Sequence, residues 1–188
     1  MTGAPNPTAR NASAIGVAIV EPTAFVKIAG RANFTSSIDF KTLVTELRTR
    51  GINHFVLDLG ECVTMDSTFL GVLAGLVMRN ADGVETSVPG ESLQFDLLNP
   101  NPRISDLLDN LGVIHMFTVR HQSIPCTALF EPVNNKHPAP TKEEISRNCL
   151  EAHEVLMRVN PDNIPKFKEV TRFLAEDLRK PGSREGQT

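Results

Sequence analysis

Asp66, Ser67 and Thr68 are three consecutive residues with side-chain oxygens, and they lie between an apolar segment and a segment with helical periodicity. All three residue types cap helix N-termini. The Ser67 hydroxyl, or Asp66 beside it, could simply accept hydrogen bonds from the free amides of the first helical turn. Alternatively, Ser67 is exposed at the positive end of a helix, where free amides and the helix dipole could hold a phosphoryl group.

The segments on either side predict a strand and a helix. Residues 55–59 form a short apolar run interrupted only by Asp58 and bounded by glycines, which is typical of a buried central strand. After Thr68, apolar residues recur at helical spacing, namely Phe69, Leu70, Val72, Leu73, Leu76 and Val77. The sequence therefore predicts that a loop after a buried strand delivers Ser67, open to solvent, to the first turn of a helix.

Residues 56–59 and 65–73 together resemble the central motif of STAS domains, the bacterial anti-sigma factor antagonists (anti-anti-sigma factors). That family usually shows an apolar strand, a short loop, and then Asp-Ser-Ser/Thr-Gly-Leu at the start of a helix. By this resemblance Ser67 is the regulatory phosphoacceptor and Asp66 is its acidic neighbour. Phe69 stands where the family usually has glycine, and a bulky ring there could reshape the partner-binding turn or slow a kinase.

The resemblance also implies a partner-binding surface made of Asn33, Asp66, Ser67, Thr68 and Phe69. Asn33 ends a Gly-Arg-Ala-Asn segment that aligns with the family's Gly-Glu-Leu-Asp turn before its first helix. Asparagine keeps the capping ability of the usual acid and loses its charge. From the residues alone, Asn33 is a turn or cap residue.

The rest of the chain supplies the other elements of an α/β domain. The predicted elements are a hairpin of strands 15–21 and 24–29, a helix over 36–49, a strand over 92–98, a helix from Pro102 to Gly112, and a strand over 113–119. Alternating strands and helices imply parallel pairings with right-handed crossovers. The order matches a STAS domain over residues 14–120: a STAS-like mixed β-sheet with helices packed mainly on one face.

Four further segments flank this domain. Residues 1–13 are predicted to be a flexible arm, 121–140 a proline-rich linker or strap, 141–180 a C-terminal helical hairpin, and 181–188 a flexible end. Thr141 and Glu144 form a capping-box pattern at the start of the hairpin. Both of its helices are amphipathic, so we expect them to pack on the bare sheet face or edge, or to form a homodimer by pairing helices or exchanging tails.

Composition narrows the class of protein. The 188 residues are 40% hydrophobic and can bury one good core, while a net charge of -3 gives no electrostatic case for nucleic acid. The three cysteines have no metal-site spacing, which favours reduced thiols in a cytosol. The longest mostly apolar stretch, residues 69–78, is too short to cross a bilayer, and no secretion signal is evident. We expect a cytoplasmic protein without membrane insertion.

Enzymatic chemistry finds little support in the sequence. A phospho-aspartate receiver needs an early acid pair and a later lysine, and only Glu21 is available early. A serine hydrolase needs a glycine-flanked elbow and a histidine-acid pair. His54 precedes the strand, at the end opposite Ser67, and the other four histidines, His115, His121, His137 and His153, are interpreted as surface or packed residues. We expect no catalytic residues, no metal and no cofactor.

The functional prediction is therefore a regulatory binding module. Unmodified, the surface around Ser67 would dock an anti-sigma factor with serine kinase activity, or another switch protein. Phosphorylation of Ser67 would add charge at the helix start and end the docking. One alternative is an unphosphorylated STAS scaffold in a sensor or lipid-transport complex, with Phe69 in a constant hydrophobic contact. A serine hydrolase or phospho-aspartate receiver is a more distant alternative.

Overall fold

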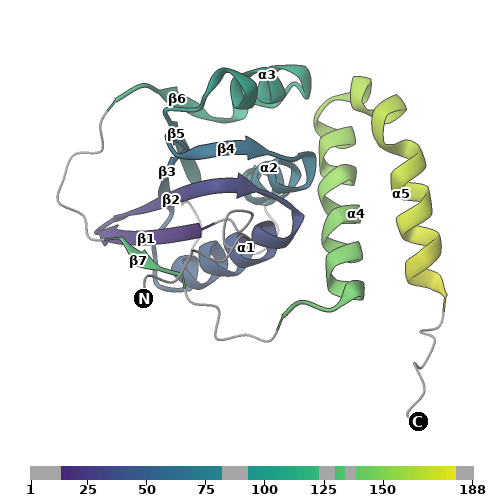
Figure 1. The fold of residues 1–188 in the computed structure, drawn as a ribbon, viewed down its shortest axis with the longest axis horizontal. Helices are drawn as coiled ribbons and strands as arrows, with labels where there is room; N and C mark the ends of the chain where they lie inside the picture. The colour runs from purple at the N-terminus through teal and green to yellow at the C-terminus, as the bar shows by residue number, and fades with distance from the viewer. Residues whose placement is uncertain (1–13, 82–92, 123–129, 134–138, 181–188) are drawn as a thin grey trace, which may run out of the picture.

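Seven strands form one mixed β-sheet in this computed structural model, which describes residues 14–81, 93–122, 130–133 and 139–180 (Figure 1). The strands are β1 (Ala14–Val20), β2 (Thr23–Ala32), β3 (His54–Asp58), β4 (Cys62–Met65), β5 (Gln94–Leu98), β6 (Thr118–Arg120) and β7 (Glu131–Pro132). The sheet order is β6-β5-β3-β2-β1-β7, and β4 pairs with β2. Strand β1 is antiparallel to β2 and β7, whereas the other pairs are parallel, which confirms the predicted mixed sheet.

In the part of the chain that the structure describes, five α-helices accompany the sheet. They are α1 (Phe34–Thr49), α2 (Ser67–Ala81), α3 (Pro102–Asn110), α4 (Lys142–Val159) and α5 (Ile164–Arg179). Helices α1 and α2 contact each other, and α4 stands beside them at the end of the sheet where β2 and β4 finish (Figure 1). No helix in the described ranges is long and apolar enough to cross a bilayer.

The core lies between the sheet and these helices. Alternate residues of β2 are buried, as expected for a strand with one face against the core. Phe40 of α1 contacts Phe69 of α2 and Phe95 of β5, with ring centroids 5.1 and 6.2 Å apart. Fully burying a phenylalanine side chain stabilises a fold by about 1.5–3 kcal/mol. These rings therefore anchor both helices to the centre of the sheet.

Local capping signals in the sequence are confirmed. Asn33 caps α1 and forms a reciprocal capping box with Ser36. Asn101 caps α3, with Pro102 in the first turn, and Thr141 forms the expected capping box with Glu144 at the start of α4. These caps begin helices because each side-chain oxygen satisfies an amide that has no partner within its own helix.

The predicted strands need correction at three places. The apolar segment 113–119 is not one strand: Ile114–Met116 is a 3-10 turn, and β6 begins only at Thr118. Strand β4 was not expected, and β7 lies inside the predicted linker, where it pairs with β1. The predictions for residues 1–13 and 181–188, and for residues 123–129 and 134–138 of the linker, concern segments outside the described residues.

The C-terminal helices do not cover a bare sheet face or edge. Helix α4 packs on α2 and α1, and α5 packs mainly on α4. Of the two arrangements expected for the tail, packing on a bare sheet face or edge is therefore wrong, because the amphipathic stripe of α4 is buried against other helices. The homodimer stays a prediction. This arrangement brings α4 to the start of α2, where the predicted site lies.

Candidate functional site

The ends of two neighbouring strands bring two helix N-termini together. Strand β4 pairs in parallel with the last residues of β2, and the Asp66 amide donates to the Ala32 carbonyl at 2.9 Å. Helix α1 begins just after Ala32, and α2 begins just after Asp66. The site residues predicted from two distant segments, Asn33 and Asp66, are thus neighbours in space.

The Asp66 carboxylate joins the two helices. One oxygen accepts the Phe69 amide of α2 at 2.8 Å, and the other accepts the Phe34 amide of α1 at 2.8 Å. Asp66, rather than Ser67, is therefore the residue that caps α2. Burial raises the pKa of Asp66 above its ordinary 3.8, while the amides of Phe69 and Phe34 act in the opposite direction.

Ser67 is the first residue of α2, and its hydroxyl is paired with the C-terminal tail. Ser67 Oγ lies 3.0 Å from Nε2 of His153 on α4. The side chain is half-buried, so the expectation of a hydroxyl open to solvent is corrected: α4 lies over it. Ser67 remains at a helix N-terminus, where the dipole favours negative charge.

His153 is the residue that sequence reasoning missed. It is buried, and its ring stacks on Phe167 of α5 with centroids 4.7 Å apart. Burial lowers the pKa of His153 below 6.5, although the Asp66 carboxylate and the Cys149 backbone favour the charged form. The available signal was its place beside Ala152 and Leu156 on the apolar stripe of α4, but that stripe did not reveal which surface it covers.

Thr68 and Phe69 lie below the surface. Thr68 is buried, and its hydroxyl lies 3.7 Å from the Cys149 sulfur of α4. Phe69 is fully buried in the aromatic core, so its side chain does not line the surface where the sequence placed it. The bulky ring at the usual glycine position thus fills the core instead of reshaping the exposed turn.

Nucleophilic catalysis by a serine requires the nucleophile, a base beside it and a group that orients the base. Ser67 and His153 could supply the first two. No side chain in the described residues supplies the third part, the group that orients the base: Nδ1 of His153 is buried without a hydrogen bond, and the polar group that acts on the ring from its own helix is the Cys149 backbone. The carboxylate of Asp66 is already used by two backbone amides. The described ranges also contain no group of three or more side chains suited to a metal ion.

The depressed pKa of His153 predicts a pH-dependent contribution to stability. Below pH 6.5 the unfolded chain takes up the histidine proton before the folded chain does, so this stabilisation is present above that pH and is lost as the pH falls. The slope for one such group is at most about 1.4 kcal/mol per pH unit.

Urea unfolding of wild type and His153→Gln at a series of pH values measures this contribution. The difference between the two free energies of unfolding should shrink as the pH falls below 6.5. The comparison cancels the titration of the other histidines. A difference that stays constant across that range would show that His153 is not held neutral in the fold.

Comparisons with known proteins give a structural similarity only. No protein-family model matches the chain, and no curated protein matches it significantly in sequence. Among similar solved structures is a Thermotoga maritima protein described as an anti-sigma factor antagonist, with 19% identity and a TM-score of 0.48. The match covers 58% of this chain and 87% of the Thermotoga maritima chain. Another is the anti-sigma factor antagonist SpoIIAA in its unphosphorylated form, with 15% identity, a TM-score of 0.47, and coverages of 58% and 88%.

Proposed function

We propose that this chain is a cytoplasmic regulatory binding module of the STAS type, an anti-sigma factor antagonist whose docking surface is centred on Ser67. The observation that carries the proposal is the position of Ser67 at the first residue of α2, beside the convergence of two helix N-termini. Asp66 and Asn33 fix the backbone of both helix starts there. A surface at two helix N-termini is sensitive to added charge.

Phosphorylation of Ser67 would provide the switch. The partner, an anti-sigma factor with serine kinase activity, would move the γ-phosphoryl group of ATP to Ser67 Oγ. The hydroxyl proton would pass to a base of the kinase, and ADP would leave. The modification adds about two negative charges beside Asp66, which changes the surface offered to the partner. This chain is the substrate and ligand in that reaction, and the kinase supplies the chemistry.

Incubation with a cognate serine kinase and ATP, followed by mapping of the modified peptide by mass spectrometry, tests the switch. We expect one phosphoryl group on Ser67 and none in Ser67→Ala. Thr35→Ala, which changes an exposed hydroxyl in the first turn of α1, is the matched control and should be labelled as wild type is. Phosphate on other residues only would contradict the proposal.

A scaffold that is never phosphorylated is the main competing function. It would use the same surface without a switch. Binding of the purified partner to Ser67→Asp separates the two functions: a scaffold keeps its partner, whereas a switch loses it.

A homodimer through the C-terminal helices is compatible with either function, because α5 exposes three large apolar side chains, Ile164, Val170 and Phe173. Light scattering that finds only monomers would exclude the homodimer.

The Ser67–His153 contact favours one further candidate, an enzyme with a serine nucleophile. Their 3.0 Å separation is suitable for proton transfer. Among the described residues no side chain orients Nδ1 of His153, and α4 covers Ser67; both observations argue against an enzyme. Turnover of a p-nitrophenyl ester that is lost in both Ser67→Ala and His153→Gln would support the enzyme; we expect none.

A further inference from the structure

Helix α4 covers the end of α2 that carries the candidate site. Two contacts are made to consecutive residues of the first turn: His153 to Ser67 at 3.0 Å, and Cys149 to Thr68 at 3.7 Å. The ring of His153 is in turn backed by Phe167 of α5. A partner or kinase that approaches Ser67 from this side therefore meets the tail of the same chain first.

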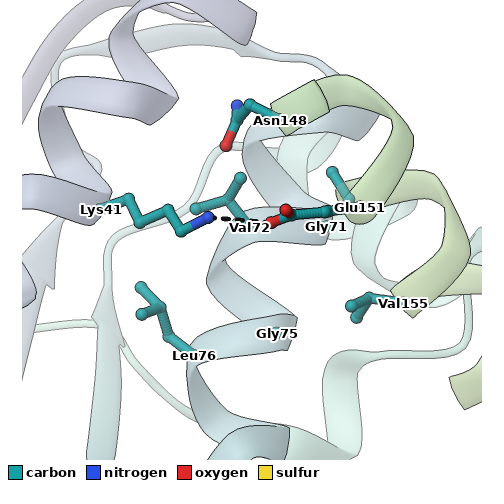
Figure 2. Close-up of a pocket in the computed structure, with 9 residues that line it drawn as sticks. Lys41, Gly71, Val72, Gly75, Leu76, Asn148, Glu151 and Val155 are labelled. Atoms are coloured by element: carbon teal, nitrogen blue, oxygen red, sulfur yellow. Dashed lines mark hydrogen bonds and ion pairs between the residues drawn. The ribbon is translucent and has the colours of Figure 1, made fainter. Parts of the chain in front are cut away.

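The packing between α4 and α2 leaves little room for an added group. A Cβ atom on Gly71 would lie 2.4 Å from the Ala152 carbonyl oxygen, so the two helices touch through backbone atoms. Figure 2 shows Gly71 and Gly75 of α2 facing α4, with Val155 beside Gly75. The cavity lined by Gly71, Gly75 and Ala152 measures about 30 Å³, room for water. A wider groove of about 810 Å³ lies beside it, between α1 and the start of α4.

Specific polar contacts hold the cover in place. Asn148 donates to the Ser37 hydroxyl of α1 at 2.9 Å in a buried position, and Glu151 pairs with Lys41 at 3.0 Å (Figure 2). At the other end of α4, the buried Asn163 side chain donates to the Leu111 carbonyl at 2.9 Å. The covered arrangement is therefore a defined state, and uncovering requires these contacts to break.

A phosphoryl group on Ser67 would disturb this arrangement. Ser67 Oγ and Nε2 of His153 are already in hydrogen-bond contact at 3.0 Å, so oxygens added to Ser67 on the side facing α4 would displace the His153 ring. The group would also place about two negative charges beside the half-buried Asp66 carboxylate. Like charges in a poorly solvated place repel strongly.

We infer that α4 is an autoinhibitory cover: phosphoryl transfer to Ser67 and docking at the Ser67 surface require α4 to lift, and a phosphorylated Ser67 keeps it lifted. This inference rests on the proposed function for the identity of the modification. The fraction of molecules in which α4 is lifted then limits the apparent affinity for the kinase, because only those molecules can bind it. A partner that binds the lifted α4 would make Ser67 accessible to the kinase.

The lifting of α4 can be measured without any kinase. Cys149 lies on the side of α4 that faces α2 and is half-buried there, so its rate of alkylation by N-ethylmaleimide, mapped by mass spectrometry, reports on the lifting of α4. We expect Ser67→Glu in the full chain to raise this rate at least about tenfold. Ser67→Ala, which only removes the hydrogen bond, should raise it less. Thr35→Glu places the same charge on an exposed residue of α1 and should leave the rate unchanged.

A reversible lock provides the second test. Thr68→Cys places a thiol opposite Cys149, since the present Thr68 oxygen is 3.7 Å from that sulfur, and oxidation should tie α2 to α4. Labelling of Ser67 by kinase and ATP should fall at least about tenfold in the oxidised protein relative to the same protein after reduction.

The outcomes separate the cover from the switch. Equal labelling in the oxidised and reduced forms would overturn the cover and leave the phosphorylation switch intact. No labelling in wild type or in reduced Thr68→Cys would count against the proposed function, while the alkylation rates would still decide the cover. A Ser67→Glu rate equal to or below that of wild type would overturn the cover directly.

Discussion

Gly71→Ala should destabilise the protein, although glycine to alanine within a helix usually stabilises it by about 1 kcal/mol. The new Cβ would lie 2.4 Å from the Ala152 carbonyl oxygen and 2.7 Å from its carbonyl carbon. Backbone atoms cannot rotate away as a side chain can, so α4 must move as a whole. Overpacking of this kind costs about 1–3 kcal/mol, and the expected result is a lower midpoint of urea unfolding together with faster alkylation of Cys149.

Gly75→Ala is the matched control on the same helix. Its Cβ would meet the two Val155 methyl groups at 3.3 and 3.8 Å, and that side chain can shift by a few tenths of an ångström. We expect no loss of stability, or a small gain from the better helix propensity of alanine. If Gly71→Ala were instead as stable as Gly75→Ala, the result would contradict the close approach of the Ala152 backbone to Gly71.

Most of the fold could be predicted because it follows from local signals. Asn33, Asn101 and Thr141 mark helix starts through side-chain oxygens that act within three residues. The order of apolar strands and amphipathic helices then limits the topology. Strand β4 escaped prediction because it is four residues long and depends on a partner in β2, where the pairing shifts register between Gly30 and Arg31.

The cover over the candidate site could not be read from the chain. Ser67 and His153 are 86 residues apart, and nothing in their local patterns says that they meet. Apolar spacing showed that α4 has a buried stripe, but a stripe does not identify the surface it covers. The same holds for Phe69. The resemblance to STAS domains placed this residue on the partner-binding surface, whereas its ring packs against Phe40 in the core. Contacts between distant segments decide both cases.

Asp66 is the residue on which both helix starts depend, and Asp66→Ala should cause the other large loss of stability. The substitution leaves the Phe69 and Phe34 amides without the carboxylate that each donates to at 2.8 Å. Losing one such cap costs about 0.5–2 kcal/mol, so the loss of two caps predicts roughly 1–4 kcal/mol. The effect is measured as the free energy of unfolding in urea.

Asn33→Ala is the comparison that shows whether Asp66 acts on two helices. Asn33 accepts amides only within α1, from Thr35 and Ser36, so its loss should cost about 1 kcal/mol. Asp66→Asn keeps one acceptor oxygen and should fall between the two alanine variants. Because Asp66 links α1 to α2, amide hydrogen exchange in Asp66→Ala should quicken in the first turns of both helices, and in Asn33→Ala in α1 alone. Faster exchange restricted to α2 in Asp66→Ala would show that the Phe34 contact contributes nothing, and that the two helix starts are positioned by the strands beneath them.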